Sequence, residues 1–361
     1  MVNTNYFHKG CSDLFQSKTK QNGFISRWPN WIGYVAVGWS LLYGFMHVYW
    51  LLGGKGYPFK QGDMGLFGAM ITHFPSKVGG AFITILCFLG IFVGFIMQKK
   101  KREFVSSGLL LFYAWGVSFV FIFLTSDISL IMVMAYAFLF EFTFDWGMIN
   151  QLICIIGALF WILAAISFQR RSRNACEFCG RNKEDLEPFV LVRWGRWLTI
   201  VAALAPVPYA ITRFAWALHI PLGVSRKALQ ELSNINPMAN LTEWVFGFLC
   251  IGGGILTLGL IQRWGEIFPV WFPFIGGKRV PIMLAVVPAL IVAIAVTIAG
   301  FVFTFGFLAI TLHLAPINNI VLGQIYGAVG PMIFWVPWGL TLGLSAIAYY
   351  YRRRGGCTYC G

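Results

Sequence analysis

Two short segments of the sequence each combine an arginine cluster with a Cys-x-x-Cys-Gly motif. The first, QRRSRNACEFCG, contains Cys176 and Cys179, and the second, YYRRRGGCTYCG, contains Cys357 and Cys360. Four thiolates arranged as two Cys-x-x-Cys pairs are the ligand set of a structural zinc site. The flanking arginines favour the thiolate form, because nearby positive charge stabilises the anion. We therefore predict that the two pairs together bind one structural zinc ion.

The separation between the two pairs is much longer than in an ordinary zinc-binding module, so other interpretations stay open. Each pair could act as a separate redox dithiol, although neither lies in the βαβ context of thioredoxin-like proteins. Four thiolates also suit an iron–sulfur cluster, and the cysteines can stay reduced and uncoordinated. A structural disulfide is disfavoured in a reducing cytosol.

A second set of chemically capable residues lies inside or beside apolar segments. His47 and Arg213 are ionisable, and ionisable residues at membrane depth usually face the protein interior or water and serve a function. The predicted outward-facing pocket comprises Tyr43, His47, Trp50, Tyr209, Arg213 and Trp216, with Glu141 and Asp145 at its rim. The alternative is that His47 and Arg213 reach toward the membrane interface, where the aromatic residues form a belt.

The composition indicates which elements must carry these residues. Of the 361 residues, 58% are hydrophobic and 11% are charged, and the mean hydropathy is +0.73. A soluble domain carries about 25% charged residues. Apolar runs of about 20 residues, the length that crosses a hydrocarbon core, recur along the chain. The composition therefore predicts an all-α polytopic membrane protein.

Eight apolar segments are long enough to be transmembrane helices. They are residues 31–52, 78–97, 105–124, 151–168, 197–218, 244–261, 282–305 and 325–351. The segment 128–146 has a shorter apolar core, so it is predicted to be an interfacial helix or an extension of the third span. Residues 1–30 are polar and basic and form a predicted cytoplasmic tail without the apolar region of a signal peptide.

The distribution of basic residues predicts the topology. The chain has 27 Lys and Arg residues and a formal net charge of +14. With both termini in the cytoplasm, few basic residues lie outside. These are Lys55, Lys60, Lys77, Arg213, Arg226 and Lys227. This bias follows the positive-inside rule. Because the basic residues flank apolar runs, they indicate topology and contact with membrane lipids, not nucleic-acid binding. We expect a multipass protein of the bacterial plasma membrane.

The two halves of the chain resemble each other. Residues before and within the first span recur at one constant offset around the fifth span. The matched pairs are Arg27 and Arg193, Trp28 and Trp194, Trp31 and Trp197, Tyr43 and Tyr209, and Trp50 and Trp216. Each half then ends in a Cys-x-x-Cys-Gly motif. We therefore predict two parallel four-helix repeats, residues 31–180 and 181–361, related by an axis along the membrane normal.

One stretch of the first repeat is similar to a known family. The segment HVYWLLGGKGYP (His47–Pro58) resembles the His-x-Tyr-Trp-x-x-Gly-Gly signature of small four-helix bacterial membrane proteins, domain of unknown function 3995. The segment RWGEIFPVWFPFIGGKRVP (Arg263–Pro281) resembles a motif of longer uncharacterised bacterial membrane proteins. In the second repeat, Arg213 stands in place of the histidine. The resemblance implies a four-helix unit and no activity.

These features favour a protein that transports, flips or binds an amphipathic or anionic small molecule or lipid in a pocket between the repeats. A zinc site at the cytoplasmic ends would restrain that face, so we expect the pocket to open outward. The sequence has no nucleotide-binding or serine-hydrolase motif. One alternative is a membrane-embedded enzyme acting on a lipid or quinone, with His47, Glu141 or Asp145 as acid–base candidates. Another is a non-catalytic membrane assembly or resistance factor.

Overall fold

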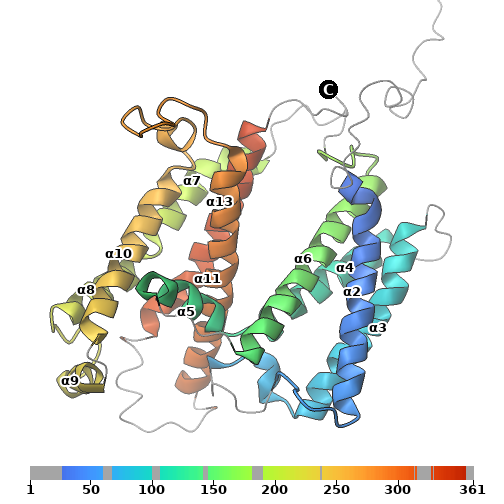
Figure 1. Ribbon diagram of the computed structural model, residues 1–361, viewed down its shortest axis with the longest axis horizontal. Coiled ribbons are helices and arrows are strands. Elements are labelled where there is room, and N and C mark those ends of the chain that lie inside the picture. Colours follow the sequence, from blue (N-terminus) through green and yellow to red (C-terminus); the bar gives the residue numbers. More distant parts are fainter. Residues whose placement is uncertain are drawn as a thin grey trace, which may run out of the picture.

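The computed structural model describes residues 27–59, 67–99, 106–140, 145–180, 190–235, 238–312, 314, 327 and 329–354. Eight helical segments of this described chain are long and apolar enough to cross a membrane (Figure 1). They are α2 (Trp28–Leu51), α3 (Ser76–Gln98), α4 (Ser107–Phe119) with the π-helical turn η4 (Val120–Leu124), α6 (Trp146–Ser172), α7 (Val190–Leu204) with α8 (Val207–Ala217), α10 (Ala239–Leu258), α11 (Ile282–Thr311), and η7 (Gly330–Phe334) with α13 (Trp335–Arg353). The eight predicted spans are confirmed, with boundaries that shift by several residues.

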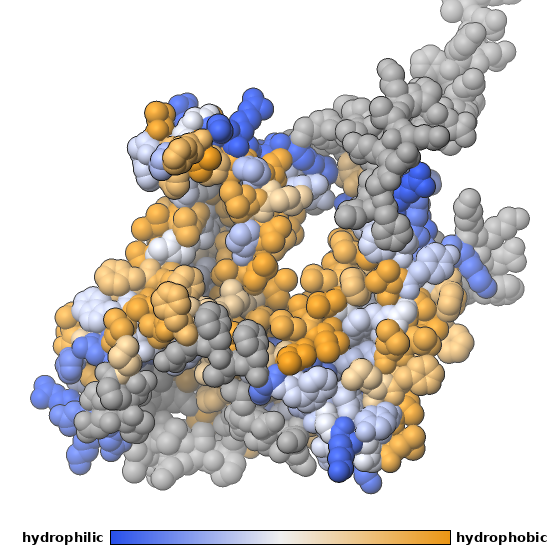
Figure 2. All heavy atoms as spheres, in the orientation of Figure 1, coloured by the Kyte–Doolittle hydropathy of each residue, from blue (hydrophilic) through white to orange (hydrophobic). Residues whose placement is uncertain are grey.

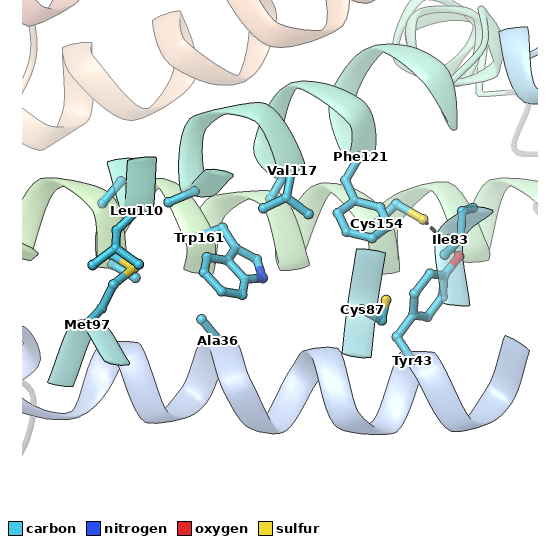
Figure 3. Packing of buried hydrophobic residues seen from close by; sticks show 14 of the residues in the cluster. Ala36, Tyr43, Ile83, Cys87, Met97, Leu110, Val117, Phe121, Cys154 and Trp161 are labelled. Carbon is cyan, nitrogen blue, oxygen red and sulfur yellow. Dashed lines mark hydrogen bonds between the residues drawn. The ribbon is translucent and has the colours of Figure 1, made fainter. Parts of the chain in front are cut away.

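The four helices of the first half pack into one group around Trp161. Helix α2 packs against α3 and α6, and α4 packs against α6. Trp161 of α6 is completely buried and donates its indole N–H to the Ser40 hydroxyl of α2 over 3.0 Å. Figure 3 shows this core, in which Tyr43, Phe121 and Cys154 gather near one end. The first group therefore has an apolar core of its own.

The helices of the second half form a separate group around α13. Helix α13 packs against α7 and α11, and α10 packs against α7 and α8. At Gly339 the helices α11 and α13 approach closely, because a Cβ there would lie 2.1 Å from the Thr297 hydroxyl oxygen. Small residues allow such close packing of transmembrane helices. The fifth span divides into α7 and α8 at Pro206, since proline within a helix lacks the N–H donor and clashes with the preceding turn.

A short helix joins the two groups. Within the segment 128–146, residues Ser129–Tyr136 (α5) and Ala137–Leu139 (η5) form a helix that lies against α11. The non-helical residues after η4 separate it from α4, so the segment is not an extension of the third span. At the same level Phe123 of η4 contacts Phe301 of α11, with ring centroids 5.3 Å apart.

The outer surface of both groups is apolar. Leu42, Phe92, Phe112 and Phe248 lie on four different helices and are largely exposed. Figure 2 shows hydrophobic residues over the sides of both groups. Exposed apolar area on this scale indicates contact with a membrane rather than with water. Together with the eight spans, it defines a multipass integral membrane protein.

Candidate functional site

The first Cys-x-x-Cys pair forms a turn beyond the end of α6. The Gly180 N–H donates to the Cys176 carbonyl over 2.7 Å and closes the turn. Gly180 has a φ of 71°, a left-handed conformation that glycine adopts without strain. Cys176 and Cys179 are half-buried, and neither forms a disulfide bond within the described part of the chain. The turn therefore keeps both thiols near the protein surface, where a metal ion can reach them.

Arginine side chains bind the backbone carbonyls of this turn. Arg170 donates from Nη1 to the carbonyls of Glu177 and Phe178 over 2.9 and 2.8 Å. Arg354, at the end of α13 in the other half, donates from Nη1 to the Cys179 carbonyl over 2.7 Å. The Arg354 contact also places the end of α13 beside the first cysteine pair.

The second pair, Cys357 and Cys360, lies outside the described residues. Among the residues that the structure describes, no three His, Cys, Asp or Glu side chains come close enough to hold a metal ion. The four-cysteine zinc site therefore stays a prediction.

His47 is completely buried in an aromatic enclosure. Its ring centroid lies 4.8 Å from that of Tyr43, 4.9 Å from that of Trp50 and 6.0 Å from that of Tyr57, all in edge-on arrangements. Phe59 stacks at 6.2 Å. Neither ring nitrogen of His47 has a hydrogen-bond partner within the described part of the chain. An imidazole N–H can instead point at a neighbouring ring face. His47 thus lies in the interior of the first group.

The loop after α2 covers this enclosure. Gly53 and Gly56 have φ values of 96° and 88°, which lets the chain turn back toward α2. The Gly56 carbonyl accepts a hydrogen bond from the Trp146 indole at the start of α6 over 2.8 Å. Burial raises the pKa of Tyr57 to about 12, so its phenol stays neutral at physiological pH. The glycines of HVYWLLGGKGYP therefore position Tyr57 and Phe59 over His47.

A buried polar network joins Tyr43 to α6. The Tyr43 hydroxyl donates to Asn150 Oδ1 over 3.1 Å and lies 3.1 Å from Cys154 Sγ (Figure 3). Asn150 and Cys154 are completely buried. The next residue, Gln151, donates from Nε2 to the Asp127 carbonyl over 3.1 Å. Neither amide was among the residues predicted from the sequence, although two adjacent amide side chains at the start of an apolar span were an available signal.

The acidic residues predicted at the pocket rim have different outcomes. Asp145 accepts a hydrogen bond at Oδ1 from the Met148 N–H over 2.8 Å, which makes it the N-cap of α6. Its role in the structure is to satisfy the helix end. Glu141 lies outside the described residues.

Arg213 of α8 forms a buried ion pair with Glu243 of α10. Its Nη1 lies 3.1 Å from Oε1 and 3.0 Å from Oε2, and both residues are buried. The guanidinium carbon lies 4.4 Å from the Tyr209 ring centroid and 4.6 Å from that of Trp216. The carboxylate and the ring faces together compensate the buried charge. Glu243 stands just outside the predicted sixth span and was not among the residues predicted from the sequence.

The structure places the six aromatic and ionisable residues of the predicted pocket in two clusters. The first three lie in the core of the first group, and the other three lie in the second group. All the ring contacts, hydrogen bonds and ion pairs given above for these residues stay within one group. The structure therefore brings three residues together in each half and does not bring the two sets together.

An opening separates the two groups. Figure 2 shows it as a gap between the spheres with hydrophobic residues around it, and Figure 1 shows that α6 on one side and α11 and α13 on the other flank it. Near the cysteine-bearing end, the Arg354–Cys179 hydrogen bond joins the groups. Toward the other end, the contact of Phe123 with Phe301 joins them. The opening is therefore bounded at both ends.

The helices beside the opening present apolar side chains. Helix α6 packs on α2 and α4, and it leaves Ile156, Leu159 and Leu163 between 37% and 47% exposed. Helix α13, on the other side of the opening, exposes Leu340 and Leu344. Exposed apolar side chains on both flanking helices suit hydrocarbon chains better than ions.

Comparison with protein-family models, curated protein sequences and solved structures found no match to this chain. The resemblance of the His47–Pro58 segment to a four-helix family therefore stays an expectation.

Proposed function

We propose that this integral membrane protein binds an amphipathic, anionic lipid in the opening between its two four-helix groups and moves it between the membrane leaflets. The observation that supports this proposal is the opening itself, which is flanked by apolar helices and has basic residues at one end. Acyl chains can lie along α6 and α13, where burial of apolar surface contributes about 25 cal/mol per Å². This proposal replaces the expected six-residue pocket, because that set divides into two clusters.

The charges at the cysteine-bearing end match an anionic headgroup. Helix α6 ends with Arg170 and Arg171, and α13 ends with Arg352 and Arg353. Most of these guanidinium groups already bind protein carbonyls or side chains. Arg173, beyond α6, is exposed, and the described residues form no salt bridge with it. Arginine binds phosphate oxygens with paired, charge-assisted hydrogen bonds.

Native mass spectrometry of the purified protein tests the binding step. Leu159→Trp and Leu163→Trp add bulk beside the opening, and we expect the double variant to lose co-purifying phospholipid about tenfold. Leu42→Trp, at a 68% exposed position on α2, is the matched control and should keep its lipid. Arg173→Gln should weaken anionic lipid roughly 10- to 100-fold, since a charged hydrogen bond contributes about 1.5–3 kcal/mol. Equal lipid content in all variants contradicts the proposal.

Flux measurements test the movement step. Proteoliposomes carrying a fluorescent anionic phospholipid should show protein-dependent exchange between leaflets, and Leu159→Trp with Leu163→Trp should slow it. Binding without exchange rejects the flipping step, and chemical conversion of the bound lipid favours the alternative of a membrane enzyme.

The pattern of helix pairing supports the proposed duplication. In both groups the first apolar helix packs on the second and the fourth, and the third packs on the fourth. Tyr43 lies beside Cys154 of its fourth helix, and the matched Tyr209 lies beside Trp335 of its own, with ring centroids 5.1 Å apart. We propose parallel repeats with the cysteine-bearing ends in the cytoplasm, as the basic residues favour.

We also propose that the four cysteines bind one zinc ion that ties the ends of α6 and α13. The Arg354–Cys179 hydrogen bond supports it, because Arg354 stands only three residues before Cys357 in the sequence. Elemental analysis of freshly reduced protein should find about one zinc per chain, lost in Cys176→Ser and kept in the control Cys11→Ser. Iron in place of zinc, or no metal, overturns this assignment.

A further inference from the structure

The loop between α10 and α11 is an ordered hairpin. The Phe268 N–H donates to the Lys278 carbonyl over 3.0 Å, and the Val280 N–H donates to the Glu266 carbonyl over 2.9 Å. Ile267 and Arg279 pair as an antiparallel bridge between these bonds. The two arms of the loop therefore hold each other in register without any other element.

Helix α13 fixes the base of this hairpin. Arg352 donates from Nη2 to Glu266 Oε1 over 2.8 Å, and Arg353 donates from Nη1 to the Val280 carbonyl over 3.0 Å. The Tyr349 hydroxyl donates to the Gly265 carbonyl over 2.6 Å. Three successive contacts from the last turns of one transmembrane helix set the direction in which the loop leaves the protein.

The tip of the hairpin exposes large apolar side chains. Val270 is 89% exposed, Trp271 77% and Phe274 95%. In the chain as described, Phe274 is the most exposed large hydrophobic residue, although its backbone is fixed in a left-handed conformation with φ 66°. A fixed backbone that directs aromatic rings away from the protein would be unfavourable in water, because each ring would expose apolar surface to the solvent. The exposed side chains of the tip would therefore be more stable in an apolar environment than in water.

Positive charges flank this tip. Arg263, Lys278 and Arg279 are exposed, and the described residues form no salt bridge with them. The one acidic residue of the hairpin, Glu266, is already paired with Arg352. Basic residues beside aromatic ones match the boundary of an anionic bilayer, where the rings reach the acyl region and the charges stay among the headgroups.

We propose that residues 269–274 insert into the anionic leaflet beside the cysteine-bearing ends of the spans. The hairpin connects the ends of α10 and α11, so its base lies at the level where these helices leave the hydrocarbon, which favours the bilayer over a protein partner. Insertion anchors the second group at a point outside the helical bundle. This proposal does not depend on the lipid-binding function proposed for the opening.

Photocrosslinking in vesicles tests the insertion. Phe274 is replaced by p-benzoylphenylalanine, a change that its exposure permits. The protein is then reconstituted in vesicles prepared from phosphatidylcholine with about 30% phosphatidylglycerol, which supplies the negative surface charge. The same replacement at Leu42 within α2 is the lipid-facing control, and at the exposed Asn174 it is the aqueous control. We expect lipid adducts at Phe274 at a yield within about threefold of Leu42 and well above Asn174. Adducts to protein, or a yield equal to that at Asn174, overturn the proposal.

The charges give a second, independent measurement. Lys278→Gln with Arg279→Gln should lower the adduct yield at Phe274 several-fold in vesicles with phosphatidylglycerol. The yield should change little in vesicles of pure phosphatidylcholine. The melting temperature of the variant identifies any loss of folding, which would lower the yield at Leu42 as well. Equal yields in both vesicle types, with and without the two charges, contradict the electrostatic part of the argument.

Discussion

The buried pair of Arg213 and Glu243 makes the sharpest prediction about the second group. We expect Glu243→Leu alone and Arg213→Met alone each to lower the free energy of unfolding by about 3–5 kcal/mol, because each leaves one buried charge uncompensated. The double variant replaces the pair with apolar side chains of similar size. It should lie within about 1–2 kcal/mol of the natural protein.

The magnitude follows from the geometry of the pair. At the observed 3.0 Å, the attraction in a medium of effective dielectric constant near 20 is about 5 kcal/mol. The Tyr209 and Trp216 rings, 4.4 and 4.6 Å from the guanidinium, add about 0.5–2 kcal/mol each. Removing both charges from water costs several kcal/mol per ion, which offsets most of this gain. The pair is therefore nearly neutral as a unit and costly to divide.

Equilibrium unfolding in mixed detergent micelles, followed by circular dichroism, measures all four proteins. The control is Thr242→Val beside Glu243, where a methyl group replaces the hydroxyl that bonds the Met238 carbonyl over 3.0 Å. We expect this control to cost less than about 1.5 kcal/mol. If the losses of the two single variants add in the double variant, the charges do not compensate each other and the reasoning is refuted.

Other substitutions test the packing and the polar network in the same assay. Gly339→Ala should lower the free energy of unfolding by about 1–3 kcal/mol, because its Cβ would clash with the Thr297 hydroxyl. Gly343→Ala is the control and should be tolerated, because its Cβ would lie 3.5 Å from its nearest neighbour. Equal effects of the two substitutions would contradict this packing. Tyr43→Phe should cost about 1–3 kcal/mol, since it leaves a buried amide oxygen without its donor; no change would mean that the hydrogen bond is not made. Asp145→Ala should cost about 1 kcal/mol through loss of the helix cap, and Asp145→Asn should restore most of it.

The sequence predicted the elements of this fold because the membrane imposes them. A span needs about 20 apolar residues, and no water is present to satisfy an open backbone, so hydropathy alone defined the eight helices. The sequence did not predict which helices pack together. That depends on small residues such as Gly339 and on breaks such as Pro206, whose effect appears only once a neighbouring helix is in place.

The site was less predictable because its partners come from distant helices. Arg213 was identified, but Glu243 stands at the edge of another span and gives no local sign of pairing. Tyr43 was identified, but Asn150 reads as a polar residue at a helix start. Periodicity places a side chain on one face of its own helix, and it carries no information about the helix opposite.

The second helix of each group explains why the first group has His47 where the second group has Arg213. Cys87 of α3 lies in the first core, and Cys250 of α10 lies in the second core, each in the same cluster as the matched tyrosine. Two helical turns before Cys250 stands Glu243, and at the same distance before Cys87 stands Gly80. At this position the second group therefore has a carboxylate, from Glu243, whereas the first group has no side chain, because the residue is Gly80.

This difference selects the residue on the facing helix. A side chain longer than a methyl group at Gly80 would meet Leu51 and Tyr57, whose nearest atoms lie 3.1 and 3.7 Å from a Cβ placed there, and Tyr57 in turn covers His47. A permanent cation in place of His47 would be enclosed by rings, and among the described residues no carboxylate pairs with that position to compensate it. In the second group Glu243 supplies the compensation, so Arg213 is retained there. One four-helix plan thus holds an imidazole enclosed by aromatic rings in one half and a charge pair in the other. Both arrangements are buried inside their own groups, so the opening between the groups is the place where a ligand can reach the protein.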